Sequence, residues 1–260
     1  MAEPMLKFIA KDQETPQKRK PEVRAKDFLE IYGEFILKKA EEQASRCSQC
    51  GVPFCQSGCP LQNNIPDWLK LAATNRLEEA YNISAATNPL PEICGRICPQ
   101  DRLCEGNCVI EQSSHGAVTI GAIERFITET AFKNNWVKPL KPRITRAQSV
   151  GIIGSGPAGI AAAQRLLGLG YKVTIYDRHD RAGGLLVYGI PGFKLEKEAV
   201  QRRFDELVAG GATLKLGQNI GTDLPFDDIK KSHDAILIAT GVYKARGLGL
   251  TSEEGAIEAL

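Results

Sequence analysis

Long apolar runs are missing from this 260-residue sequence. No stretch approaches the ~18–20 apolar residues that a membrane-spanning helix needs, because the richest region, residues 150–171, is broken by glycine, proline, Gln164 and Arg165. The N-terminus carries no charged stretch followed by an apolar core, so no secretory signal is expected. A net charge of +2 is too small to indicate nucleic-acid binding. These absences predict a globular, cytoplasmic protein that binds neither a nucleic acid nor a membrane.

Cysteine is absent before residue 47 and after residue 108, and all eight cysteines fall in two groups. Residues 47–59 have the spacing C-x2-C-x4-C-x3-C-P, and residues 94–108 have C-x3-C-x5-C-x3-C. In a reducing cytoplasm, clustered thiols favour metal ligands over disulfides. Zinc usually takes paired C-x2-C knuckles, often with histidine, whereas here only one C-x2-C and one nearby histidine, His115, are present. Three closely spaced thiols plus a distant fourth, ending in Cys-Pro, indicate 4Fe–4S clusters.

The spacing also predicts which cysteines share a cluster. In two-cluster ferredoxins, the cysteine before proline ligates the other cluster. Applied here, the first cluster takes Cys47, Cys50, Cys55 and Cys108. The second cluster takes Cys59, Cys98 and Cys104, which leaves it one ligand short.

Two residues are candidates for the missing ligand, Cys94 and Glu124. Glu124 lies on the same apolar stripe as Ile127 in the helix that we expect over 118–131. A carboxylate in that position is costly unless it is paired or bound to a metal. The alternative is a glutamate at the helix edge that pairs with Arg125 or with a lysine, and the pattern alone does not choose between them.

The segments around the cysteine groups show helical patterns. A helix is expected from about Arg24 up to the first cysteine group, with apolar residues at helical spacing: Phe28, Ile31, Tyr32, Phe35 and Ile36. Further helices are expected to start at Pro66, to run from Leu77 to near Asn88, and to span 118–131. Prolines and charges over 138–146 predict a linker.

After this linker the pattern changes to that of a dinucleotide-binding fold. A strand over Ser149–Ile153 leads into Gly154-Ser-Gly-Pro-Ala-Gly159, a helix follows, and a second strand, Lys172–Tyr176, ends at Asp177. This is G-x-G-x-x-G between a strand and a helix, with an acidic residue ~20 positions on. The glycines would let the backbone approach a pyrophosphate at the helix N-terminus.

Two later features favour FAD over a nicotinamide cofactor at this site. A Gly183-Gly184 turn follows the second strand, and a buried-strand run over 235–239 ends in Thr240-Gly241, which is typical of FAD domains in disulfide-reductase-type flavoproteins. The expected FAD contacts are Gly154, Ser155, Gly156, Gly159, Asp177, Gly184, Leu185 and Thr240. Gly189–Pro191 and Lys194 are expected beside the isoalloxazine ring, or else as a tight turn with an exposed lysine.

We therefore expect two domains. The first, over 1–145, is a ferredoxin-like, α-helical domain with two 4Fe–4S clusters. The second, over 146–260, is an α/β Rossmann-type FAD-binding domain that is incomplete at its C-terminus. No catalytic acid, base or nucleophile is expected, because the cofactors would carry the chemistry and the three histidines follow no catalytic or ligand spacing.

Several strings are specific enough to indicate a family: QASRCSQCGVPFCQSGCPLQNNIPDWLKL, LPEICGRICPQDRLCEGNCVIEQ, VYGIPGFKLEK and ATGVYKARGL. The chain resembles the small (beta) subunits of bacterial NADPH-dependent glutamate synthase. The resemblance implies that electrons pass from NADPH through FAD and two 4Fe–4S clusters to a large (alpha) subunit, which makes L-glutamate from L-glutamine and 2-oxoglutarate. It also implies the ligand set given above, with Glu124 as the non-cysteine ligand and Cys94 beside the cluster.

The chain departs from this family in its length. The resemblance implies members nearly twice as long, with an NADPH domain after the Ala-Thr-Gly strand, and no second glycine fingerprint is present here. We therefore expect a truncated chain that lacks the NADPH site. A sibling FAD/iron–sulfur oxidoreductase subunit, of the dihydropyrimidine dehydrogenase or ferredoxin–NADP reductase type, and an inactive flavin-binding fragment are the alternative interpretations.

Overall fold

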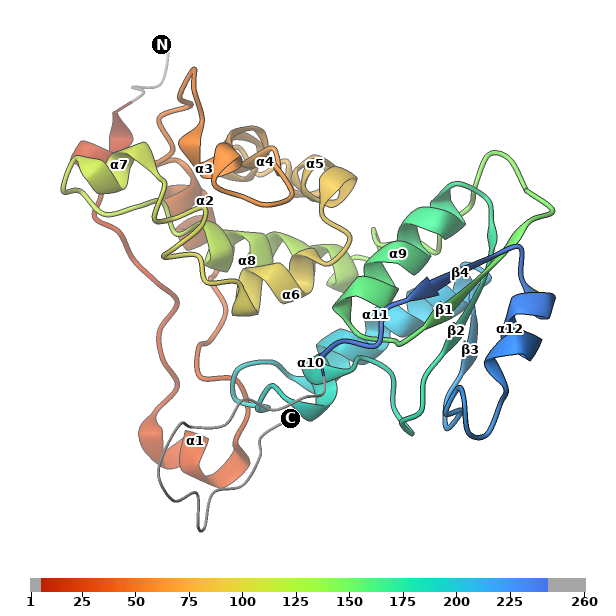
Figure 1. Cartoon of the computed structure of the whole chain (residues 1–260). Helices are drawn as coiled ribbons and strands as arrows, with labels where there is room; N and C mark the ends of the chain where they lie inside the picture. The colour runs from red at the N-terminus through yellow and green to blue at the C-terminus, as the bar shows by residue number, and fades with distance from the viewer. Residues whose placement is uncertain (1–5, 243–260) are drawn as a thin grey trace, which may run out of the picture. The chain divides into compact units, whose positions relative to one another are not determined.

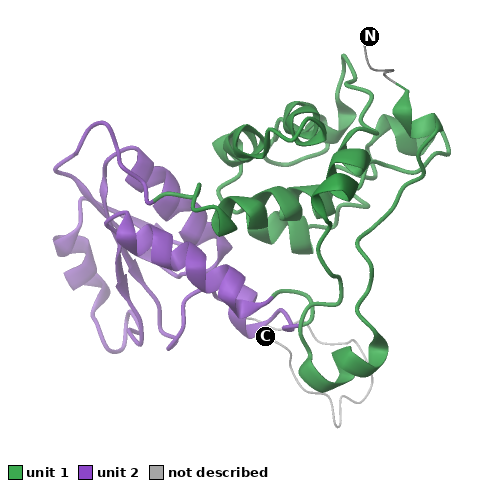
Figure 2. Ribbon diagram, turned by 180° about the vertical axis from the view of Figure 1, so that it is seen from behind, with its two compact units in different colours: residues 1–138, 193–195 green, residues 139–192, 196–260 purple. Residues whose placement is uncertain are grey.

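The structure is a computed structural model that describes residues 6–242. Contacts divide the chain into two compact units (Figure 2). Unit 1 comprises residues 1–138 and 193–195, and unit 2 comprises residues 139–192 and 196–260. The helices of unit 1 are the 3-10 helix η1 (Lys7–Ile9), α1 (Pro21–Asp27), α2 (Leu37–Ala44), α3 (Phe54–Ser57), α4 (Ile65–Ala73), α5 (Leu77–Thr87), α6 (Pro91–Ile97), α7 (Val109–Gln112) and α8 (Ile120–Lys133).

Helix α8 is the centre of unit 1, with α2, α4, α5 and α6 packed against it (Figure 1). Ile123 and Ile127 of α8 are fully buried, as is Trp68 of α4. The helix α4 begins with Pro66 in its first turn, where a missing N–H costs nothing, and its buried residues recur at helical spacing. The helices expected at Pro66, at Leu77 and over 118–131 are thus confirmed.

The continuous helix expected from Arg24 to the first cysteine group is wrong. Helix α1 ends at Asp27, and Phe28 adopts a left-handed conformation with a φ of 53°. The chain then runs extended, because it pairs with an earlier segment: Lys18 and Tyr32 form an antiparallel bridge, and the Gly33 amide donates to the Gln17 carbonyl at 2.9 Å. The apolar residues that suggested a helix therefore lie in a loop, and α2 begins only at Leu37.

Unit 2 contains a four-stranded parallel sheet in the order β3-β2-β1-β4. Its strands are β1 (Ser149–Ile153), β2 (Lys172–Tyr176), β3 (Thr213–Lys215) and β4 (Ala235–Ile238). Its helices are α9 (Pro157–Gly168), α10 (Leu185–Tyr188), α11 (Lys197–Ala209) and α12 (Phe226–Ser232). The first two strands have the predicted bounds, and α9 packs on both of them, so β1, α9 and β2 form the expected βαβ unit.

The last strand differs from its prediction in burial. A fully buried strand was expected over 235–239, but Leu237 is 38% and Ile238 63% exposed. Among the described residues, β4 pairs only with β1 and forms one edge of the sheet. An apolar run is therefore compatible with an edge strand whose side chains are not covered by residues 6–242.

In this part of the chain, no helix combines the length and the apolar composition needed to span a membrane.

Candidate metal centres and nucleotide site

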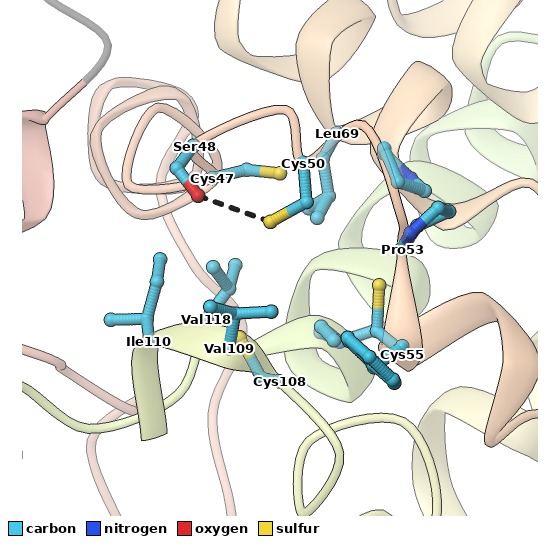
Figure 3. Close-up of a pocket in the computed structure, with 13 residues that line it drawn as sticks. Cys47, Ser48, Cys50, Pro53, Cys55, Leu69, Cys108, Val109, Ile110 and Val118 are labelled. Atoms are coloured by element: carbon cyan, nitrogen blue, oxygen red, sulfur yellow. Dashed lines mark hydrogen bonds between the residues drawn. The ribbon is translucent and has the colours of Figure 1, made fainter. Parts of the chain in front are cut away.

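Four cysteines from distant parts of unit 1 line one cavity (Figure 3). They are Cys47, Cys50, Cys55 and Cys108. The first two follow α2, the third lies in α3, and the fourth immediately precedes α7. The cavity encloses about 330 Å³ of empty space, including some open solvent, and its other lining residues are mainly apolar. The structure thus brings together the four cysteines that the spacing assigned to the first cluster.

The environment of these thiols disfavours their charged form when no metal is bound. Burial raises the pKa of Cys47 to about 11, and burial together with the neighbouring thiols raises that of Cys55 to about 12. Gln49 donates from its side chain to the Cys47 sulfur at 3.3 Å and to the Pro66 carbonyl at 2.8 Å, which ties the loop to α4. A bound cation would supply the charge that stabilises the thiolates.

The second set of predicted ligands comes from four segments: Cys59 follows α3, Cys98 ends α6, Cys104 lies in the turn after it, and Glu124 lies in α8. Burial raises the pKa of Cys104, and the charges of Glu105, Glu124 and Cys59 raise it further, so these groups lie close together. Cys98 caps the end of α6 and acts electrostatically on Glu124. Within residues 6–242, no three His, Cys, Asp or Glu side chains are arranged to hold a single metal ion.

Glu124 points into the buried side of α8 and is 8% exposed. Its Oε1 atom accepts hydrogen bonds from the Ser84 hydroxyl at 3.2 Å and from the Asn88 amide at 3.0 Å. Burial raises its pKa to about 8 despite these bonds. The alternative pairing with Arg125 does not form, because the Arg125 guanidinium binds Glu30 at 2.7 Å.

Cys94 lies beside the same set and so remains a second candidate ligand. Its sulfur donates to the Asn88 side-chain oxygen at 3.6 Å and also shares a side-chain hydrogen bond with Cys98. That hydrogen bond lowers the pKa of Cys98 to about 7. Position alone therefore does not separate Cys94 from Glu124.

The packing of α6 on α8 positions this second set. A side chain at Gly95 would bring its Cβ within 2.7 Å of the Arg125 backbone nitrogen, so only glycine permits this approach. Sequence reasoning missed an ion-pair network on the same interface. Arg96 binds Glu30 at 2.7 Å and Glu129 at 2.9 Å, and all three side chains are almost fully buried. Arg96 lies in α6, Glu129 in α8 and Glu30 in the loop before α2, so no local sequence pattern signals this network.

In unit 2, the glycines of the fingerprint shape a loop at the end of β1. Gly154 has a φ of 110°, and a Cβ there would lie 2.3 Å from the Ala239 carbonyl oxygen. A Cβ at Gly159 would lie 2.0 Å from another carbonyl, whereas one at Gly156 would meet nothing within 4 Å. Gly184 lies against Gly156, with its Cβ position 3.0 Å from the Gly156 Cα atom. The loop thus has an open backbone face at the N-terminus of α9, as phosphate binding requires.

Asp177 and Ser155 form a link across this site that the sequence did not predict. The Ser155 amide donates to one Asp177 carboxylate oxygen at 2.8 Å, and the Ser155 hydroxyl donates to the same oxygen. The other oxygen accepts from the His179 amide at 3.0 Å. Burial raises the pKa of Asp177, but these hydrogen bonds lower it more, so the net shift is downward. Asp177 therefore fixes the glycine loop, and its predicted contact with a ribose stays a prediction.

The remaining predicted flavin contacts lie near this loop or at the edge of the described chain. Leu185 is 56% exposed at the start of α10, and Thr240 is exposed after β4. Lys194 is exposed in a turn, and its place beside the isoalloxazine ring stays a prediction. In contrast, the ammonium group of Lys197 donates to the Leu186 carbonyl in α10 at 2.9 Å.

Comparison with known proteins supports both halves of this description. Residues 24–136 match the family model "dihydropyrimidine dehydrogenase domain II, 4Fe-4S cluster", and residues 152–199 match an NAD(P)-binding Rossmann-like domain. The chain therefore joins an iron–sulfur domain to a Rossmann-like domain with a parallel sheet.

Comparison over almost the whole of this chain finds further relatives. A glutamate synthase [NADPH] small chain from Azospirillum brasilense is 59% identical over 244 residues, which cover 94% of this chain and 51% of the relative. The Escherichia coli small chain is 43% identical, covering 98% of this chain and 54% of the relative. The putative oxidoreductase AegA of Escherichia coli is 42% identical, covering 99% and 40%. The chain is similar over almost its whole length to glutamate synthase small chains, and it spans about half the length of the curated relatives it matches.

Proposed function

We propose that this chain is the electron-input part of a glutamate synthase. In the whole protein, NADPH would supply electrons, and a large subunit that makes L-glutamate from L-glutamine and 2-oxoglutarate would receive them. The observation that carries the proposal is the meeting of four cysteines, from segments as far apart as Cys47 and Cys108, around one mainly apolar cavity. The similarity of the chain to glutamate synthase small chains supports the same assignment.

The residues fit the proposed cofactors. Cys47, Cys50, Cys55 and Cys108 would hold one 4Fe–4S cluster, and Leu69 and Val118 would limit the access of water to it. Cys59, Cys98, Cys104 and Glu124 would hold the second. A bound flavin would accept two electrons as a hydride and release them one at a time, and iron–sulfur centres accept single electrons.

The nucleotide site would bind FAD through its backbone. The open face at Gly156 and the N-terminus of α9 would receive the pyrophosphate. Gly154, Gly159 and Gly184 would allow the close approach, and Asp177 would accept from the ribose while it holds Ser155 in place. Leu185 and Thr240 would complete the flavin contacts. We place the protein in the cytoplasm, where its thiols stay reduced.

The proposal is tested by anaerobic purification of the chain followed by measurement of iron, acid-labile sulfide, zinc and flavin. We expect about eight irons and about one FAD per chain. A Cys50→Ser variant should lose about half of the iron, whereas replacement of the exposed Glu79 should lose none. Bound zinc in place of iron, or a chain that takes up neither iron nor sulfide, would contradict the proposal.

A sibling oxidoreductase subunit is the second candidate, because AegA matches over almost the whole chain and the matched iron–sulfur family is described from dihydropyrimidine dehydrogenase. Affinity purification of the full protein from its host separates the two. A co-purifying large subunit with glutaminase activity supports the first candidate. A partner that reduces pyrimidines supports the second.

A further inference from the structure

Arg46 is the most deeply buried cation of unit 1 among the described residues, with 0% of its surface exposed. It directly precedes Cys47 and follows α2. Each of its hydrogen bonds ends on a backbone carbonyl; the acceptors are Lys11 at 2.9 Å, His115 at 2.6 Å, Gly116 at 2.9 Å and Ala117. The guanidinium group therefore joins the N-terminal segment and the loop before α8 to the first cysteine segment.

These carbonyls satisfy the N–H groups of Arg46 but do not neutralise its charge. No carboxylate of residues 6–242 forms an ion pair with Arg46, in contrast to Arg96, which binds two glutamates. Asp12 and Glu111 act on it only at longer range, and among the charged groups Cys108 acts on it most strongly. A buried charge is costly unless an opposite charge compensates it. Negative charge near Arg46 would therefore offset the cost of burying its guanidinium group.

We infer that Arg46 is the fixed counter-charge of the cluster proposed on Cys47, Cys50, Cys55 and Cys108, an inference that rests on the proposed function. Four thiolates make such a site negative. Reduction of a bound cluster would add one electron, supplied by a flavin that would itself be oxidised by one electron, and the site would become more negative still. A fixed buried cation attracts the reduced state more strongly than the oxidised state, so it raises the reduction potential of this cluster.

The second set of ligands has the opposite surroundings. Glu105 acts on Cys104, and Glu92 acts on Glu124, so acidic groups face this set. The nearby cation Arg96 is already held by Glu30 and Glu129. We therefore expect the Arg46 charge to act on the first cluster and not on the second.

The test uses the anaerobically purified full chain and three variants. Arg46→Gln removes the charge, Arg46→Lys keeps it with a different hydrogen-bond geometry, and Arg76→Gln is a control at an exposed arginine of the same unit that pairs with Glu79. Redox titration monitored by electron paramagnetic resonance gives the two potentials, and Cys50→Ser identifies the signal of the first cluster. We expect Arg46→Gln to shift only the first potential to a more negative value, Arg46→Lys to stay near the wild type, and Arg76→Gln to change neither.

An Arg46→Gln variant that keeps all its iron and both potentials would overturn the inference. If that variant loses half of its iron, Arg46→Lys decides: restored iron supports the counter-charge, and an equal loss shows that only the hydrogen bonds matter and overturns it. A wild-type chain without iron overturns the proposed function itself, which separates the two failures.

Discussion

Replacing Glu124 by glutamine separates its proposed role as a ligand from its role in packing. The side-chain oxygen of glutamine can still accept from Ser84 and Asn88, which now donate to Oε1 at 3.2 Å and 3.0 Å. Because the pKa of Glu124 is raised to about 8, the metal-free carboxyl is mainly protonated at pH 7, and the neutral amide resembles that form. The fold of the metal-free chain should therefore survive this change.

Alanine at the same position should be more damaging to the fold. It leaves the buried Ser84 and Asn88 donors without this acceptor, at a cost of about 1–3 kcal/mol each. A total of about 2–6 kcal/mol should lower the melting temperature of the metal-free chain by roughly 5–20 °C. The glutamine variant should stay within about 3 °C of the wild type.

The iron content should fall in both variants, because neither side chain offers a carboxylate. We expect about four irons per chain instead of about eight, measured by chemical iron and sulfide analysis and by electron paramagnetic resonance. Glu79→Gln, at an exposed helical glutamate, is the matched control and should keep about eight. Full iron and an unchanged spectrum in Glu124→Gln would refute the reasoning. The ligand would then be sought at Cys94, whose serine variant should lose the second cluster in that case.

Three further outcomes follow from the geometry. Gly95→Ala should destabilise unit 1 by about 1–3 kcal/mol and halve the iron content, because the added Cβ would lie 2.7 Å from the Arg125 backbone nitrogen. Chemical denaturation measures the stability and iron analysis the iron content, and unchanged values of both would contradict the prediction. Gly159→Ala should weaken flavin binding at least tenfold in a fluorescence titration, because its Cβ would lie 2.0 Å from a backbone carbonyl. Asp177→Asn should lower the melting temperature at pH 7. Burial raises the Asp177 pKa, but the hydrogen bonds from Ser155 and His179 lower it more, so the stabilisation by the ionised carboxylate is present above about pH 4 and lost as the pH falls. The deficit of the variant should therefore shrink by pH 3.

Local sequence patterns predicted the elements whose bounds depend mainly on neighbouring residues. The strands β1 and β2 have the predicted bounds, because β-branched residues flank a glycine turn that allows little else. Helix α4 begins beside Pro66 as expected, since proline suits a first helical turn. The grouping of Cys108 with the earlier cysteines around one cavity also agrees with its prediction from spacing.

Long-range contacts account for what the sequence did not predict. Residues 28–36 have helical spacing but run extended, because their backbone pairs with Lys18 and its neighbours. The ion pairs of Arg96 and the hydrogen bonds of Arg46 to backbone carbonyls join residues up to 71 positions apart, and no sequence periodicity signals such contacts. The exposure of Ile238 depends on which strands flank β4, and an apolar run does not carry that information.

The crossing of Cys108 to the first three cysteines has a consequence for the topology of the chain. A group bound to all four would close a loop of ~60 residues, and the same number of residues in a disulfide loop reduces the entropy of the unfolded chain by the equivalent of ~4 kcal/mol. The site would therefore act as a covalent cross-link between the two ends of unit 1's cysteine region. It cannot be completed during synthesis until the residues up to Cys108 have been made, so insertion of the metal would come after the intervening helices α4, α5 and α6 have had the chance to fold.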